Sequence, residues 1–337
     1  MSDVTKKVIL ALTVTLVTLG VAEIVLRVTN FGVLPPEMNF GVNTRAALDQ
    51  GHVLPDPDLF WKLPSRPGDQ QMRAVHPDVP VPPKGRSRRI LVMGDSCSRI
   101  SIKAPPYPVL LERILVGGEV QVWNAAVPGY TTHQGLAWLK IQLLTLDADV
   151  AVVYYGWNDH WRATGTTDRD YAERLSGQWL RLGLLVGGNP DPPPLRVSGE
   201  HYRDNLRAIV TALEEAGTAV ILVAAPSHLT SEAKGRLVQA RYLVRQDDAE
   251  ALHREYSGYL RQAATGTGAM VLDAASIFRH LDQPRRLILR DGIHLTDDGH
   301  TVMAQMIAAI LTWESDGVPD TPSLTVRASE VLADLDE

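Results

Sequence analysis

A serine stands directly after an apolar, strand-like run of the chain, where it could act as a nucleophile. Residues 90–94 are Ile-Leu-Val-Met-Gly, and Asp95 and Ser96 follow. In an open α/β sheet the parallel strands end at the edge where ligands bind, so this position would present the Ser96 hydroxyl to a ligand. A serine hydroxyl needs a base, an acid that orients the base, and hydrogen-bond donors for the oxyanion that forms on its substrate.

Candidates for all these groups lie in three later segments. Asp291 stands three residues before His294, so one short loop can hold both side chains, and the carboxylate can fix the imidazole tautomer. Gly129 and Asn158 each follow a strand-like run closely. A glycine can bring its N–H close to a ligand, and an asparagine side chain can donate a second hydrogen bond. The residue types therefore predict nucleophilic catalysis by Ser96.

The residues of the four segments occur along the chain in the order Gly94-Asp95-Ser96, Gly129, Gly156-x-Asn158-Asp159 and Asp291-x-x-His294. In order and spacing they resemble the four blocks of the SGNH (GDSL-type) hydrolase superfamily, over about residues 88–313. The resemblance implies that Ser96 is the nucleophile, that His294 is the general base, and that Asp291 orients the imidazole. It also implies an oxyanion hole formed by the N–H groups of Ser96 and Gly129 and by the Asn158 side chain.

Neighbours of these residues are expected to have structural roles. Asp95 and Asp159 would brace their loops, and His300 would pack on a helix face. Cys97, where the superfamily more often has a bulky apolar residue, would be a small buried hydrophobe rather than a rival nucleophile. Leu295 replaces a common proline, and neither departure supplies or removes a catalytic group.

The resemblance implies a two-step acyl transfer through an acyl-enzyme, and it leaves three functions open. In the first, a serine esterase removes an acetyl or other acyl group from a carbohydrate or a cell-envelope glycan. In the second, the same scaffold is an O-acyltransferase, and a sugar hydroxyl replaces water in the second step. In the third, the chain is a non-catalytic glycan-binding module, although every catalytic position is filled. Neither a metal ion nor a cofactor is expected, because no Cys/His ligand spacing occurs.

Short apolar runs alternate with helical runs along residues 88–313, which predicts parallel βαβ units. The expected strands are residues 89–94, 119–123, 150–155, 219–225 and 269–272. The expected helices are residues 107–115, 134–146, 201–216, 247–264 and 297–313. The resemblance implies a flavodoxin-like three-layer α/β/α sandwich with a parallel sheet of about five strands in the order 2-1-3-4-5. All four blocks would then lie at the carboxyl ends of strands.

The first 29 residues predict attachment to a membrane by a single N-terminal transmembrane helix. Residues 8–26 form an apolar run of about 19 residues, which nearly crosses a hydrocarbon core of about 30 Å. Lys6 and Lys7 precede the run, which predicts a cytoplasmic N-terminus and a catalytic domain in the periplasm or at the cell surface. Glu23 would be offset by Arg27 one helical turn later. The alternative is a signal peptide cleaved before Glu23, which would release a secreted protein.

Two further segments flank the predicted catalytic domain of residues 88–313. Residues 30–87 are rich in proline and are expected to form a spacer that wraps the catalytic domain, with Leu59-Phe60-Trp61 as an apolar anchor. Residues 314–337 form an acidic tail that is expected to be solvated and partly helical. The net charge of −6 over 337 residues, with no basic stripe, argues against a nucleic-acid partner. The single cysteine excludes an internal disulfide.

Two insertions, residues 160–194 and 227–245, are the expected places for substrate selection. Aromatic and arginine side chains at the rim of a site suit stacking on sugars or contacts with anions. The residues predicted for such a substrate rim, in and just before the first insertion, are Trp157, Trp161, Arg162, Trp179 and Arg181. The alternative for this insertion is a surface helix pair with apolar packing. The second insertion is expected to form a mobile flap.

Overall fold

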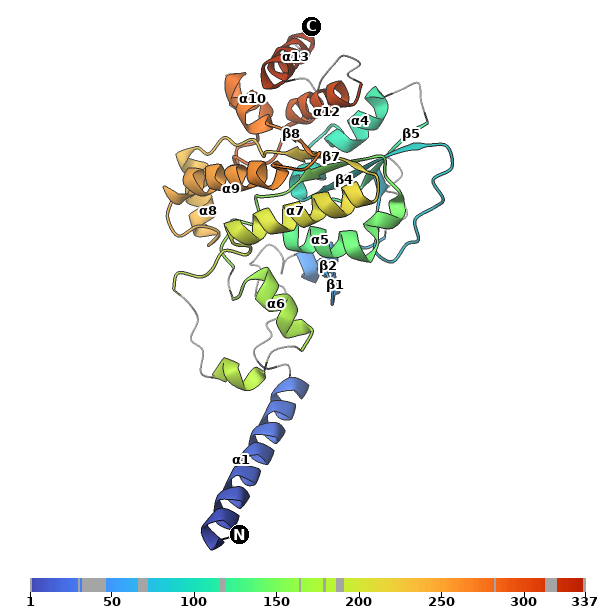
Figure 1. The fold of residues 1–337 in the computed structure, drawn as a ribbon. Coiled ribbons are helices and arrows are strands. Elements are labelled where there is room, and N and C mark those ends of the chain that lie inside the picture. The colour runs from blue at the N-terminus through green and yellow to red at the C-terminus, as the bar shows by residue number, and fades with distance from the viewer. Residues whose placement is uncertain are drawn as a thin grey trace.

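The computed structural model describes residues 2–29, 31, 47–65, 72–115, 119–163, 165–177, 180–185, 191–281, 283–312 and 320–335. These residues form an α/β/α sandwich, from which a long N-terminal helix extends (Figure 1). The predicted fold class is therefore confirmed.

The central sheet has six parallel strands within the described residues, and five of them have the predicted order. Along the sheet the strands are β3 (Arg73–Ala74), β5 (Val120–Asn124), β4 (Arg88–Gly94), β6 (Val150–Tyr154), β7 (Ala219–Val223) and β8 (Met270–Leu272). Without β3, this is the order 2-1-3-4-5. The additional β3 comes from the proline-rich segment, and only two of its residues pair with β5, so no periodic pattern predicts it.

Alternate side chains of the strands face two separate cores. In β4, Ile90 and Val92 belong to one core, and Leu91 and Met93 belong to the other, as the two-residue period of a strand requires. The helices that pack on the first core are α4 (Tyr107–Ile114), α10 (Ala274–His280), α12 (Asp297–Thr312) and α13 (Thr321–Asp334). Those that cover the second are α5 (Thr132–Ile141), α7 (Gly199–Glu215) and α9 (Asp248–Ala264). Burial on both faces explains why the central strands read as continuous apolar runs.

The two insertions contain short helices. The first holds α6 (Asp168–Leu175) and η4 (Arg181–Leu185), whereas Trp179 lies outside the described residues. The second holds α8 (Ser231–Gln239), whose Ala233 and Leu237 are buried. These two apolar side chains pack α8 against the domain, and the mobility of the second insertion stays a prediction. Elsewhere lie η3 (Leu143–Leu146) and α11 (Pro284–Leu287).

The N-terminal helix α1 (Asp3–Val28) has no buried residue, and its most apolar stretch has a mean hydropathy of 2.4. It is long and apolar enough to cross a membrane, and a signal sequence has the same features. Glu23 pairs with Arg27 at 2.7 Å, as predicted. The same carboxylate accepts hydrogen bonds from the N–H groups of Arg181 and Leu182, each at 3.0 Å. The end of α1 is thus joined to η4 of the first insertion.

The proline-rich segment packs against the second core. A short antiparallel hairpin consists of β1 (Leu54–Asp56) and β2 (Phe60–Lys62). Leu59, Phe60 and Trp61 are each only 1% exposed and join Tyr130 and Trp138 in that core. The hairpin therefore lies beside the loops that follow the strands.

The acidic tail contains the helix α13, which packs on α12 and α10. Its buried residues are Leu324, Ala328, Val331 and Leu332. Their spacing is that of one face of a helix, a pattern that the acidic composition of the segment obscures. For these residues the prediction of a solvated tail is wrong.

Candidate active site

A tight turn at the end of β4 places Ser96 at the carboxyl edge of the sheet. Ser96 begins the short helix η2 (Ser96–Ser98), and Asp95 caps this helix by accepting the N–H of Cys97 at 2.9 Å. A Cβ atom on Gly94 would lie 2.8 Å from the carbonyl oxygen of Tyr154. The neighbouring strand is therefore too close for any residue but glycine before the turn.

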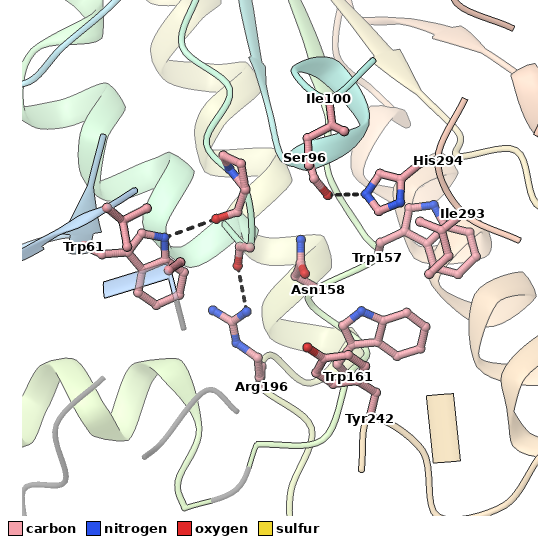
Figure 2. Close-up of a pocket in the computed structure, with 14 residues that line it drawn as sticks. Trp61, Ser96, Ile100, Trp157, Asn158, Trp161, Arg196, Tyr242, Ile293 and His294 are labelled. Carbon is pink, nitrogen blue, oxygen red and sulfur yellow. Dashed lines mark hydrogen bonds between the residues drawn. The ribbon is translucent and has the colours of Figure 1, made fainter. Parts of the chain in front are cut away.

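Ser96, His294 and Asp291 form one chain of hydrogen bonds. The Oγ atom of Ser96 lies 2.8 Å from Nε2 of His294 (Figure 2). Nδ1 of His294 lies 2.6 Å from Oδ2 of Asp291. The other carboxylate oxygen of Asp291 accepts the N–H groups of Ile293 and His294, at 2.9 and 3.0 Å. The backbone of the loop thus holds the carboxylate of Asp291 in place, and this carboxylate orients the imidazole of His294 toward the serine.

The charges around His294 favour a basic imidazole. Burial would lower the pKa of His294, but the hydrogen bond and the charge of Asp291 outweigh burial and raise that pKa above 6.5. For Asp291, burial acts in the opposite direction and would raise the pKa, but the hydrogen bonds from His294 and from the loop hold this pKa below 3.8. Asp95 differs, because burial raises its pKa to about 6. Asp291 is therefore an anion at neutral pH, and the imidazole beside it can accept a proton.

Three groups near Ser96 could donate hydrogen bonds to an oxyanion. Within the described residues, the backbone N–H groups of Ser96 and Gly129 have no hydrogen-bond acceptor. The amide nitrogen of Asn158 donates to Oδ2 of Asp95 at 3.0 Å and to the carbonyl oxygen of Tyr130 at 3.1 Å. An oxyanion would therefore meet two unused N–H groups and would share an Asn158 hydrogen with one of these acceptors.

The loop that carries Asn158 is braced by its neighbour, as the sequence predicts. Oδ1 of Asp159 accepts the N–H of Thr132 at 3.0 Å and its hydroxyl at 2.5 Å. Asp159 is fully buried, and burial raises its pKa to about 7. This bridge joins the loop after β6 to the start of α5.

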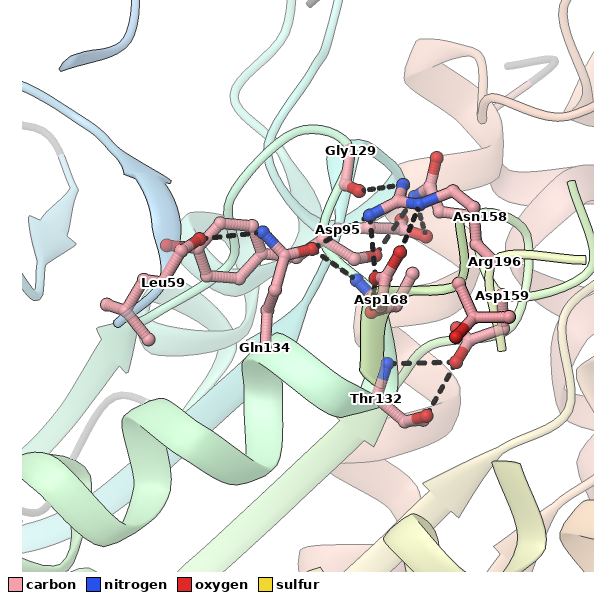
Figure 3. Close-up of polar contacts among 12 residues, drawn as sticks. Leu59, Asp95, Gly129, Thr132, Gln134, Asn158, Asp159, Asp168 and Arg196 are labelled. Carbon is pink, nitrogen blue, oxygen red and sulfur yellow. Dashed lines mark hydrogen bonds and ion pairs between the residues drawn. The ribbon is translucent and has the colours of Figure 1, made fainter. Parts of the chain in front are cut away.

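The loop that carries Gly129 is held by a buried arginine that the sequence analysis missed. Arg196 donates from Nη1 to the carbonyl oxygen of Gly129 at 2.7 Å (Figure 3). It also forms a two-pronged ion pair with Asp168, at 3.0 and 2.9 Å, and donates to Gln134 at 3.0 Å. Its guanidinium lies 5.6 Å from the ring centre of Trp61. No local motif marks this residue, because all its partners are distant in sequence.

A pocket with a volume of about 260 Å³ opens at Ser96 and His294. Its walls include Trp157 and Trp161 from the predicted rim, whose rings stack with centres 5.6 Å apart. Tyr242 from the second insertion also stacks on Trp161, with ring centres 5.6 Å apart. The apolar and aromatic residues that line the pocket are Ala47, Val53, Trp61, Ile100, Pro128, Trp157, Trp161, Tyr242 and Ile293.

The structure departs from the predicted rim at its two arginines. Arg162 does not line the pocket, and its guanidinium donates to the carbonyl oxygen of Pro193 at 2.8 Å. Arg181 lies at the junction with α1, where it donates to the carbonyl oxygen of Phe31 at 2.8 Å. The arginine of the pocket wall is instead Arg196.

Cys97 and His300 have the structural roles expected of them. Cys97 is fully buried, and burial raises the pKa of its thiol well above the usual value. His300 accepts the N–H of Tyr107 at 3.2 Å and lies 2.9 Å from the carbonyl oxygen of Ile100. Neither side chain lines the pocket.

Comparison with known proteins finds one matching family. The sequence model described as GDSL-like Lipase/Acylhydrolase family matches residues 92–302. The GDSL esterase/lipase CPRD49 of Arabidopsis thaliana is 27% identical over 188 residues, which are 53% of this chain and 72% of that protein. A lipase/acylhydrolase from Enterococcus faecalis is 20% identical, with a TM-score of 0.47 over 66% of this chain and 93% of its own. The acetylxylan esterase Axe2 from Geobacillus stearothermophilus is 18% identical, with a TM-score of 0.46 over 69% of this chain and 97% of its own.

Proposed function

This chain belongs to the GDSL-like lipase/acylhydrolase family, and we propose that Ser96, His294 and Asp291 hydrolyse an acyl ester of a carbohydrate. The family makes the chain an ester-hydrolysing serine hydrolase. The observation that carries the assignment of residues is the hydrogen-bonded chain from Ser96 through His294 to Asp291, which opens on the aromatic pocket.

In the proposed mechanism, Ser96 Oγ attacks the ester carbonyl carbon while Nε2 of His294 takes the hydroxyl proton. The carbonyl oxygen becomes an oxyanion, which the N–H groups of Ser96 and Gly129 and the amide of Asn158 stabilise. As the intermediate collapses, His294 gives its proton to the leaving alcohol and an acyl-enzyme remains. Water then attacks the acyl carbon and loses a proton to His294. The carboxylic acid leaves, and the proton returns to Ser96.

The composition of the pocket supports a small acyl group on a sugar. Trp61, Trp157, Trp161 and Tyr242 line the pocket with aromatic rings, which can form apolar contacts with a sugar ring. The volume of about 260 Å³ leaves little room for a long acyl chain beside a sugar. We therefore favour a short acyl group, such as acetyl.

The contacts of α1 support an uncleaved anchor with the hydrolase outside the cytoplasm. Cleavage before Glu23 would remove the helix that holds this carboxylate against Arg181 and Leu182. Lys6 and Lys7 at the start of the helix favour a cytoplasmic N-terminus. The mass of the mature protein tests this part of the proposal, because loss of the first 22 residues would contradict an anchor.

Labelling with a fluorophosphonate, followed by peptide mapping, tests the nucleophile. We expect the label on Ser96, its loss in Ser96→Ala, and its retention in Ser176→Ala, which removes an exposed serine at the end of α6. Hydrolysis of 4-nitrophenyl acetate should follow the same pattern. Full esterase activity in Ser96→Ala would refute the assignment.

Product analysis with an acetylated oligosaccharide and an excess of unacetylated acceptor separates hydrolysis from transfer, because only a transferase forms new acetylated sugar faster than free acetate.

A further inference from the structure

A second pocket lies beside the catalytic one, and we propose that it binds an anionic group, a carboxylate or a phosphate, of the acylated glycan. This inference rests on the proposed function, because it concerns the substrate of the same site. The second pocket has a volume of about 490 Å³. It lies between the loop after β7, one face of α9, and α10.

Three arginines line this second pocket. Arg254 and Arg261 lie seven residues apart on one face of α9, and Arg279 comes from α10. All three side chains are exposed to solvent. Arg261 pairs with Asp273 at 2.6 Å. Arg254 and Arg279 form no ion pair or hydrogen bond with any part of the chain that the structure describes. Two arginines that line the cavity therefore have guanidinium donors with no partner in the part of the chain that the structure describes.

The acidic groups nearby do not neutralise this charge. Glu250 also lines the second pocket, but it pairs with Lys234 at 3.2 Å. Asp273 is taken up by Arg261. A guanidinium presents a flat pair of N–H donors that matches a carboxylate or a phosphate. The excess of positive charge in a concave site therefore selects an oxyanion.

The two pockets share a wall. The ring of His253, which lines the second pocket, stacks on Trp157 of the catalytic pocket with centres 4.1 Å apart and planes 13° apart. Burial lowers the pKa of His253 to about 4, and the charge of Arg279 acts in the same direction. This wall is therefore uncharged at neutral pH, and the attraction for an anion comes from the arginines beyond it.

The loop after β7, which lines the second pocket, contacts the loop that carries His294. The N–H of His228 in the second pocket donates to the carbonyl oxygen of Gly292 at 3.0 Å. A Cβ atom on Gly292 would lie 3.2 Å from the side chain of Leu229. Gly292 precedes Ile293, which lines the catalytic pocket. The two pockets thus have neighbouring walls, and we expect a glycan with its ester at Ser96 to extend past this loop toward the arginines.

The test compares kcat/KM for three acetylated sugars with the full chain in detergent micelles. The substrates are an acetylated glucose oligosaccharide as the neutral reference, and the same acetylated oligosaccharide ending in glucuronate or in glucose 6-phosphate. The variant is Arg254→Ala/Arg279→Ala, and the charge-matched control is Arg285→Ala, which removes an exposed arginine of α11 outside both pockets. The wild type should prefer at least one anionic substrate over the neutral one. The double variant should lose that preference by about tenfold or more, because hydrogen bonds to charged groups are the strong ones.

The outcomes separate the ligands and the two proposals. If the double variant loses a preference for the glucuronate substrate alone, the ligand group is a carboxylate. If it loses a preference for the phosphate substrate alone, the ligand group is a phosphate. Equal preferences in the double variant and the wild type would overturn the anion site. If the wild type hydrolyses no ester, calorimetric titration with inorganic phosphate and with glucuronate decides. If the wild type binds an anion and the double variant does not, the anion site stands although the proposed function fails. Equal binding by both proteins, or no binding, would overturn the anion site as well.

Discussion

Replacing Arg196 by methionine should destabilise the domain by about 3–5 kcal/mol, because it leaves a buried carboxylate without its counter-ion. The side chains of Arg196 and Asp168 are only 5% and 0% exposed. Without the guanidinium, Asp168 would keep the hydroxyl of Thr131 at 2.6 Å as a donor. The carbonyl oxygen of Gly129 would also lose the donor that holds its loop.

The midpoint of thermal unfolding, measured on the full chain in mild detergent, gives the size of this loss. For a domain of this length about 1 kcal/mol shifts the midpoint by roughly 2–4 °C, so we expect a decrease of about 6–20 °C. Arg169→Met is the matched control in the same region. It breaks a pair with Glu173 whose arginine is 60% exposed, and such pairs contribute at most about 1 kcal/mol.

A double-mutant cycle tests the cause of the effect. In Asp168→Asn/Arg196→Met neither member of this buried pair carries a charge. The double variant should therefore be more stable than the sum of the two single losses predicts. At temperatures where all variants are folded, turnover should fall in Arg196→Met and not in Arg169→Met, because only the former releases Gly129. Equal midpoints for the two single arginine variants, or additive losses in the cycle, would refute the reasoning.

Three further predictions concern the catalytic groups. The reaction needs a neutral His294, so kcat/KM should fall as the pH drops through the raised pKa of this imidazole. Asp291→Asn should move this acid limb of the pH profile to lower pH. An acid limb that stays in place would contradict the role of Asp291. Asn158→Ala should lower kcat by a factor of roughly 10²–10³, measured with 4-nitrophenyl acetate, and an unchanged kcat would exclude its amide from the oxyanion hole. Asp159 has a pKa raised from 3.8 to about 7, so the stability it contributes is complete below about pH 4 and is lost as the pH rises through about 7, by at most about 4 kcal/mol. Asp159→Asn should lack that loss in denaturant titrations between pH 4 and pH 8, and an identical pH dependence would show that another group causes it.

The sequence predicted the elements whose information is local. The central strands β4, β6 and β7 are buried on both faces, so their apolar runs stand out without any knowledge of the fold. Ser96, Gly129 and Asn158 lie in the loops that follow β4, β5 and β6, and Asp291 and His294 share one loop, so the fold needs only to gather strand ends to bring all of them together. This is why the order of the motifs was enough to predict which side chains meet.

Side chains that depend on distant contacts could not be predicted in this way. Arg196 lies 67 residues from Gly129 and 28 from Asp168, and nothing near it in the sequence distinguishes it from the exposed arginines. Arg162 seemed better placed for the pocket because it follows the asparagine block, but the chain turns its guanidinium toward Pro193. Composition also misled, because the acidic residues of the tail hid the apolar face of α13.

Trp61 shows why the segments outside the four motifs matter for chemistry. Its indole N–H donates to the carbonyl oxygen of Pro128 at 3.1 Å, and its ring would lie 3.1 Å from a Cβ atom on Gly129, whose φ is +82°. The hydroxyl of Tyr130 donates to the carbonyl oxygen of Trp61 at 2.5 Å. With Arg196 holding the carbonyl oxygen of Gly129, contacts from two distant segments fix this loop beside the catalytic pocket. The catalytic site thus extends across the predicted domain boundary at residue 88. Trp61 of the proline-rich segment packs on the oxyanion loop, and Arg196, which follows the first insertion, holds a carbonyl oxygen of the same loop.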